Sequence, residues 1–114
     1  MQIINIENIE QAKEQLEKIG CQDKGVEIMA PKMIFKVIKL EDVKPKAAHI
    51  IKQHMLSVGG EAAVSKKAWN LEEESTDILV SGTLKQFKIF CEKTKDQPFG
   101  VPEIGQKIKD LLKL

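Results

Sequence analysis

The segment from Pro45 to Gln86 constrains the fold of this chain more than any other, because it holds two glycine-containing turns between a helical pattern and a strand pattern. The first helical pattern begins at Pro45, ends at Gly59-Gly60 and is followed by a short strand pattern. Proline suits the first position of a helix, and glycine suits the position just after its end. The second half reverses this order, because a strand pattern ends at Ser81-Gly82-Thr83 and a helical pattern follows. Together the two halves predict a sheet and helices that share one core.

Apolar periodicity and turn residues predict the other elements. Asn8 is expected to cap a helix that Gly20 ends, and Thr83 is expected to cap a later helix. We expect strands at residues 2–6, 33–40, 61–65 and 77–80, and helices at residues 9–19, 46–58, 84–95 and 102–114. Residues 25–31 are expected to be irregular or a short strand, because Gly25 and Pro31 bound them.

This order predicts an α/β fold, a small sandwich with a mixed sheet of about four strands and about four helices. Helices that separate strands favour parallel neighbours joined by right-handed crossovers. Residues 33–40 carry apolar side chains on both faces, which indicates an interior position in the sheet. The length of 114 residues favours a single domain over residues 1–114.

Composition excludes several classes of function. The net charge is +1, basic residues are spread along the chain, and there are four Phe, one Trp and no Tyr, so neither a nucleic-acid surface nor a membrane surface is indicated. Cys21 and Cys91 lie far apart, and His49 and His54 are five residues apart, so no metal site is predicted. No signal peptide or membrane-spanning run is visible, and we expect a cytoplasmic protein with reduced thiols. The oligomeric state stays open.

The turn Ser81-Gly82-Thr83 is the first candidate for a ligand site. The start of a helix carries unpaired N–H groups and the positive end of the helix dipole, and both favour an anion. Gly82 would let a ligand approach the backbone, and Lys85 with Gln86 would lie one turn into the helix. The alternative is a simple helix cap at Thr83, which strand-to-helix turns often contain.

The turn Gly59-Gly60 is the second candidate. Its exposed carbonyl groups suit a cation or an amino group, although a helix stop followed by a tight turn explains the same residues. If the strands at 61–65 and 77–80 pair antiparallel, both turns lie at one end of the sheet. The candidate ligand-binding residues are then Lys52, Gln53, Ser57, Gly59, Gly60, Ser81, Gly82, Thr83, Lys85 and Gln86.

Four runs of this chain, taken in order, resemble one family. They are residues 28–32 (Ile-Met-Ala-Pro-Lys), 44–65 (from Lys-Pro-Lys-Ala-Ala to Ala-Ala-Val-Ser), 77–86 (from Asp-Ile-Leu-Val-Ser to Lys-Gln) and 97–100 (Gln-Pro-Phe-Gly). They are similar to the N-terminal extension of the longer, clostridial-type dihydropteroate synthases of folate biosynthesis.

The resemblance implies an accessory domain and gives it a partner, the C-terminal pterin-binding barrel of the same parent chain. The family's (β/α)8 barrel needs about 250 residues, so it is not in this chain, and no catalytic residue and no cofactor can be assigned. The alternative function is a stand-alone module that binds a small anionic ligand.

Overall fold

The computed structural model describes residues 1–114, and its elongated shape measures 52 × 30 × 21 Å. Its elements, in chain order, are α1 (Ile9–Ile19), α2 (Asp23–Met29), the 3-10 helix η1 (Ala30–Lys32), β1 (Phe35–Val43), α3 (Pro45–Ser57), β2 (Glu61–Ala63), α4 (Lys66–Trp69), β3 (Thr76–Thr83), α5 (Leu84–Lys93) and α6 (Val101–Leu112). No helix is both long enough and apolar enough to cross a lipid bilayer.

The three strands form one antiparallel sheet in the order β1-β3-β2. The α/β class is confirmed, but the prediction of about four strands in a mixed sheet and about four helices is wrong, because there are three strands, six α-helices and one 3-10 helix. Strands β1 and β2 run in the same direction, as the helix between them predicted, but they do not touch. Helix α3 carries the chain two strand positions away, and β3 fills the gap in the opposite direction, which is a split β-α-β arrangement.

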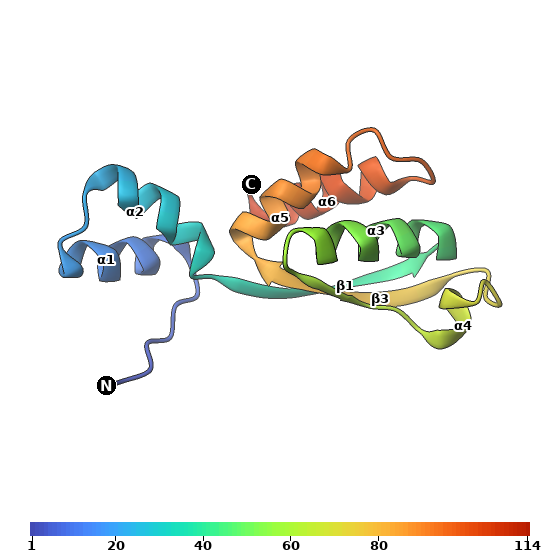
Figure 1. Ribbon diagram of the computed structural model, residues 1–114, viewed down its shortest axis with the longest axis horizontal. Coiled ribbons are helices and arrows are strands. Elements are labelled where there is room, and N and C mark those ends of the chain that lie inside the picture. The colour runs from blue at the N-terminus through green and yellow to red at the C-terminus, as the bar shows by residue number, and fades with distance from the viewer.

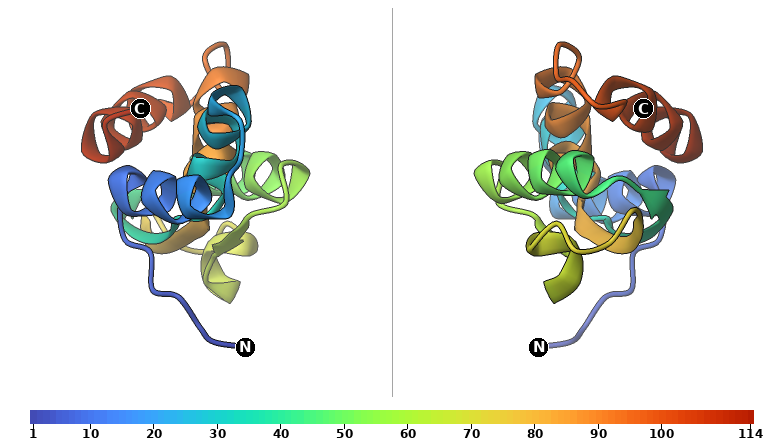
Figure 2. Two further views of the ribbon diagram at one scale, coloured as in Figure 1. Left: turned by 90° about the vertical axis from the view of Figure 1, so that its left-hand side faces the viewer. Right: turned by 90° about the vertical axis from the view of Figure 1, so that its right-hand side faces the viewer.

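Helices α3, α5 and α6 cover one face of the sheet and form the main core with it (Figures 1 and 2). The central strand β3 alternates strictly, so Ile78 and Val80 are buried under the helices while Leu79 points to the open face. Phe87 and Phe90 of α5 are fully buried in this core. The opposite face of the sheet carries exposed apolar side chains, chiefly Phe35, Val37 and Leu79.

Helices α1 and α2 and η1 lie beyond one end of the sheet (Figure 1), and a second, smaller core lies between them. Its six buried residues are Ala12, Leu16, Val26, Ala30, Ile34 and Leu84. The cap predicted for α1 is confirmed, because Asn8 Oδ1 accepts a hydrogen bond of 2.8 Å from the Gln11 N–H. Gly20 ends the helix in the left-handed conformation, with φ at 90°.

Two predictions for the N-terminal region are wrong. Residues 2–6 form no strand, because no other strand pairs with them, and Ile3 is almost fully exposed. Residues 25–31 are helical rather than irregular. Val26, Met29 and Ala30 are spaced by three and four residues, so they point to the same side, against α1, and this packing outweighs the cost of Gly25 in a helix.

The interior position predicted for residues 33–40 is also wrong, because β1 is an edge strand. Ile34 and Ile38 are buried as expected, but Phe35 and Val37 on the other face are each about 60% exposed, at 61% and 62%. One apolar face of β1 is therefore covered by helices, and the other is open to solvent.

Candidate functional site

The two glycine-containing turns meet at one end of the sheet. Strands β2 and β3 pair antiparallel, with Glu61 opposite Ser81, so Gly59-Gly60 lies beside Ser81-Gly82-Thr83. A β-carbon at Gly59 would lie 3.0 Å from Gln86 Nε2, and one at Gly60 would lie 2.7 Å from the Ser81 carbonyl oxygen. The antiparallel pairing that the ligand-site hypothesis required is therefore present.

The glycines of this junction allow close packing. A β-carbon at Gly60 would lie 2.5 Å from Met55 Cε, and one at Gly82 would lie 2.9 Å from Gln86 Oε1. Met55 is fully buried, so its side chain fills the space between the two turns. Gly59 also has φ at 91°, a conformation that side-chain-bearing residues resist.

The start of α5 uses most of its N–H groups inside the protein. The Gln86 N–H donates to Thr83 Oγ1 at 3.1 Å, and the Thr83 N–H donates to Gln86 Oε1 at 2.9 Å, which is a capping box. The Leu84 N–H donates to the Ile34 carbonyl oxygen at 3.0 Å. The cap predicted at Thr83 is confirmed, and these three N–H groups are already paired.

The polar candidates on α3 have partners of their own. Lys52 Nζ donates to Glu61 Oε1 at 3.0 Å and to the Ala62 carbonyl oxygen at 2.7 Å. The Ala62 N–H, which donates to Glu61 Oε1, and the Lys52 ammonium hold the pKa of Glu61 below its usual value. Ser57 Oγ donates to the His54 carbonyl oxygen at 2.7 Å and accepts from Lys93 Nζ at 3.4 Å.

Gln53 is exposed and Lys85 is half-buried. Anion binding by these turns stays a prediction.

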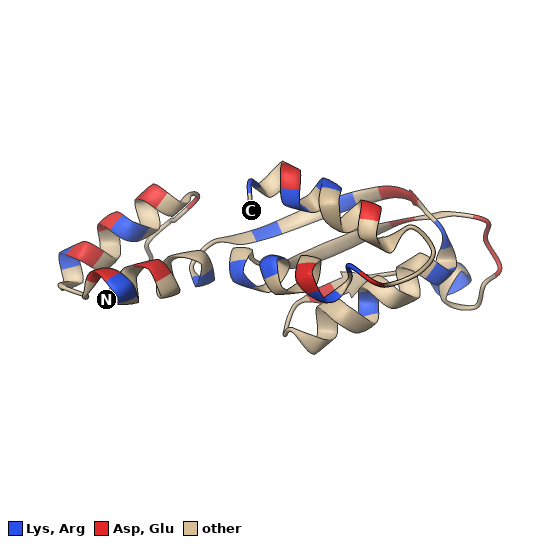
Figure 3. Cartoon of the chain, turned by 90° about the horizontal axis from the view of Figure 1, so that it is seen from above, with Lys and Arg blue, Asp and Glu red and all other residues tan.

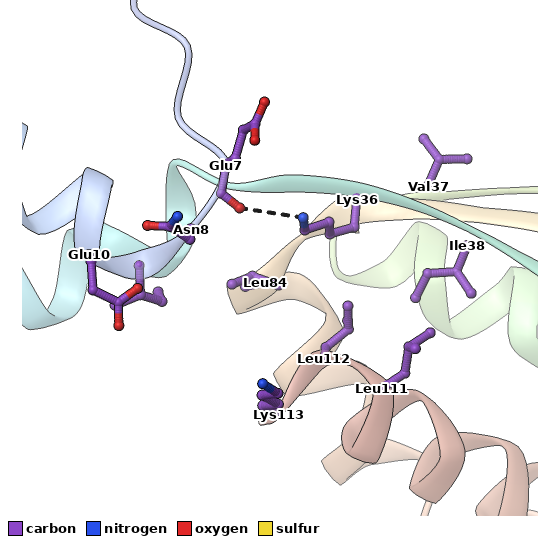
Figure 4. A pocket seen from close by; sticks show the side chains of 11 residues that line it. Glu7, Asn8, Glu10, Lys36, Val37, Ile38, Leu84, Leu111, Leu112 and Lys113 are labelled. Atoms are coloured by element: carbon purple, nitrogen blue, oxygen red, sulfur yellow. Dashed lines mark hydrogen bonds between the residues drawn. The ribbon is translucent and has the colours of Figure 1, made fainter.

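A groove of about 750 Å³ lies elsewhere, between the start of α1, the first half of β1 and the end of α6 (Figure 4). Its apolar side chains include the buried Ile38 and Leu84 and the half-buried Leu112. Charged residues from three separate segments join them, namely Glu7, Glu10, Lys36 and Lys113. Lys36 Nζ donates to the Glu7 carbonyl oxygen at 3.4 Å, which ties β1 to the residue before the cap of α1.

Sequence reasoning missed this groove, because its members are far apart in the chain. The Asn8 cap places Glu10 in the first turn of α1, and this was readable from the sequence. Nothing local indicated that Lys36 and the end of α6 would face that turn. None of the four charged side chains takes part in an ion pair.

The remaining chemistry-bearing residues form no second site. No group of His, Cys, Asp and Glu side chains is arranged to hold a metal ion. Burial raises the pKa of the Cys91 thiol, and its Sγ donates to the Gly105 carbonyl oxygen at 3.3 Å. His49 packs against Trp69, with ring centroids 4.5 Å apart. Basic and acidic residues are interspersed along α1, α2 and α6, whereas α3 and α4 carry Lys but no Asp or Glu (Figure 3).

Curated proteins resemble this chain along most of its length. The Halobacterium salinarum protein named "Probable bifunctional folylpolyglutamate synthase/dihydropteroate synthase" is 32% identical over 111 residues, which are 95% of this chain and 13% of that protein. The Helicobacter pylori "Bifunctional dihydropteroate synthase/dihydropteroate reductase" is 29% identical over 106 residues, which are 93% of this chain and 28% of that protein. A Haloferax volcanii protein with the same name as the first is 30% identical over 61% of this chain and 8% of its own length.

This chain resembles one segment of proteins that contain dihydropteroate synthase. It spans between about a tenth and about a quarter of their length. The resemblance to dihydropteroate-synthase-associated sequence is thereby confirmed, while the clostridial branch stays a prediction, because these three relatives come from Halobacterium, Helicobacter and Haloferax. No protein-family model matches the chain, and no solved structure does.

Proposed function

We propose that this chain is a cytoplasmic accessory module of folate biosynthesis that works beside a dihydropteroate synthase barrel of the same parent chain. The observation that carries this proposal is the pattern of coverage. Each of the first two relatives matches more than nine-tenths of this chain, and both names include dihydropteroate synthase. The unmatched 87% and 72% of those proteins leave ample length for a barrel.

The module itself lacks the architecture for the synthase reaction. Its sheet has three antiparallel strands, whereas the barrel of the family needs eight parallel strands and about 250 residues. We therefore expect no joining of a pterin diphosphate to p-aminobenzoate by this chain alone. A coupled assay with both substrates tests this, and turnover near the rate of a full-length enzyme would contradict it.

The open face of the sheet is the surface that we assign to contact with the barrel. Phe35, Val37 and Leu79 are 61%, 62% and 47% exposed there, and apolar patches of this kind commonly mark contacts between domains or proteins. The change Leu79→Glu should weaken binding to a separately purified barrel in isothermal titration calorimetry. Leu56→Glu serves as the control, because Leu56 lies on α3 and its side chain is about as exposed as that of Leu79. Equal binding by wild type and Leu79→Glu would contradict this assignment.

The length of the Helicobacter relative favours a second, more specific candidate function. The segment of the Helicobacter protein that resembles this chain has 106 residues and makes up 28% of that protein, so roughly 270 residues remain. One synthase barrel of about 250 residues occupies nearly all of that remainder. The matched segment is then the part of the protein left to supply the second named activity, dihydropteroate reductase.

We propose on this basis that the chain takes part in reducing dihydropteroate. In that reaction a hydride adds to C6 of the N5=C6 bond and a proton adds to N5, while a reduced nicotinamide or reduced flavin is oxidised. The test follows consumption of NADPH with dihydropteroate, with and without added FMN. Reduction that requires the chain is expected, and its absence under both conditions would contradict the reductase assignment.

The third candidate is the anion-binding module at the paired turns. Its support is the direct contact between Gly59-Gly60 and Ser81-Gly82-Thr83. A ligand present well above its dissociation constant must stabilise the folded state. A melting temperature that does not change in millimolar phosphate, pterin and p-aminobenzoate would contradict this candidate.

A further inference from the structure

The groove between α1, β1 and α6 combines an apolar floor with unpaired charges of both signs. Its volume of about 750 Å³ falls within the range usual for small-molecule sites. Ile38 and Leu84 are 8% and 7% exposed and close the bottom of the groove, while the 66% exposed Leu111 and the half-buried Leu112 supply apolar surface on which a flat ring can lie. Figure 4 shows Glu10 on one side of Leu84, and Ile38 and Leu112 on the other.

The charged residues of the groove come from both sides of this floor. Glu10 belongs to the first turn of α1, and its carboxylate makes no ion pair or hydrogen bond with another side chain. Lys36 Nζ is held toward α1 by its bond to the Glu7 carbonyl oxygen, and no carboxylate pairs with it. Lys113 adds a second ammonium at the end of α6. An acidic and a basic group are therefore both free to meet a ligand.

We propose that this groove binds a pterin that carries an aminobenzoate group, the chemical class of dihydropteroate. The pterin ring has two adjacent hydrogen-bond donors, N3–H and the 2-amino group, which match the two oxygens of one carboxylate. The benzoate carboxylate matches an ammonium group, and the flat ring matches the apolar floor. Glu10 accepts from the pterin edge, and Lys36 pairs with the benzoate. This assignment rests on the reductase proposal, from which it takes the substrate.

The test measures binding by isothermal titration calorimetry with two probes, pteroate and 6-hydroxymethylpterin, which lacks the aminobenzoate. We expect Glu10→Gln to weaken binding of both probes about tenfold, since a neutral amide replaces one acceptor and the charge. We expect Lys36→Met to weaken pteroate about tenfold and to leave 6-hydroxymethylpterin within about twofold. Glu10 is exposed, and Lys36 is half-buried with one hydrogen bond, of 3.4 Å, from its side chain, so the variants should remain folded.

Matched controls come from parts of the molecule away from the groove. Glu103→Gln lies in the first turn of α6, at the opposite end of that helix, and Lys67→Met lies in α4. Both should bind the two probes as the wild type does. Failure of the wild type to bind either probe, or equal binding by wild type, Glu10→Gln and Lys36→Met, would overturn the groove assignment.

A parallel assay of NADPH-dependent reduction separates this inference from the function on which it rests. If the probes bind with the expected pattern but dihydropteroate is not reduced, the groove stands and the reductase assignment is wrong. If reduction occurs at the same rate and with the same KM in wild type, Glu10→Gln and Lys36→Met, the reductase stands and the groove is not its substrate site.

Discussion

The helix-covered sheet and the N-terminal helices differ in how much core each can form alone. The sheet with α3, α5 and α6 has a cluster of 14 buried residues, including Phe87 and Phe90. The cluster under α1 and α2 has six, and two of these, Ile34 and Leu84, lie at the start of β1 and of α5. None of the 14 residues of the larger cluster comes from α1, α2 or η1, so we expect the N-terminal helices to depend on the sheet more than the sheet depends on them. The groove lies along this boundary, so the stability of the two regions affects the site directly.

The largest effect should come from breaking the main core. Phe90→Ala removes a fully buried aromatic side chain and should cost about 3–5 kcal/mol of unfolding free energy. Because this core supports both regions, the amides of α1 and β3 should lose protection together in hydrogen exchange. Ile19→Ala, at an 82% exposed position, is the control and should change stability by less than about 0.5 kcal/mol. Loss of protection confined to α5 would contradict the dependence of α1 on the sheet.

A smaller effect, limited to one region, is expected at Leu16. This side chain is 5% exposed in the N-terminal cluster, and Leu16→Ala should cost about 2–4 kcal/mol of local stability. Hydrogen exchange should then accelerate in α1 and α2 while the amides of β3 remain protected. Equal acceleration in β3 would show that the two regions unfold as one unit.

The sequence identified the parts of the fold that depend on neighbours in the chain. The Asn8 cap, the Gly59 stop and the Thr83 cap each follow from a few adjacent residues, and each is present. The strand predicted at residues 2–6 is absent, and the interior position predicted for β1 is wrong. Both depend on pairing in a sheet, which is set by the distant strand that is available.

The same limit applies to the candidate sites. The meeting of the two turns follows from antiparallel pairing, which puts the start of one strand beside the end of the other, and the structure adds the register, with Glu61 opposite Ser81. The groove joins residues 7–10, 36–38 and 111–113 with Leu84. No periodicity or motif relates these segments, and only the packing of α1 and α6 on either side of β1 brings them together.

Substitutions at two glycines, one in each region, should change the free energy of unfolding by an intermediate amount. Gly59→Val should cost about 1–2 kcal/mol, because φ is 91° and its β-carbon would lie 3.0 Å from Gln86 Nε2. Gly25→Ala in α2 should be neutral or stabilising by up to about 1 kcal/mol, since its β-carbon would meet only Met29 Cε, at 3.5 Å. Urea denaturation measures both changes. A neutral Gly59→Val would remove the backbone argument for this turn.

The smallest effect is expected from protonating Glu61 of β2, which pairs with Lys52 of α3. The Ala62 N–H and the Lys52 ammonium hold the pKa of Glu61 below its usual value of 4.5. The stabilisation from ionised Glu61 is therefore complete above pH 4.5 and disappears as the pH falls through the lower folded-state pKa. Glu61 is exposed, so solvent screening keeps this contribution small.

Glu61→Gln should lower the urea midpoint slightly at pH 6 and should match the wild type at pH 2, with Glu74→Gln as the exposed control in the loop before β3. A difference between wild type and Glu61→Gln that persists unchanged at pH 2 would mean that the side chain acts through packing rather than through its charge.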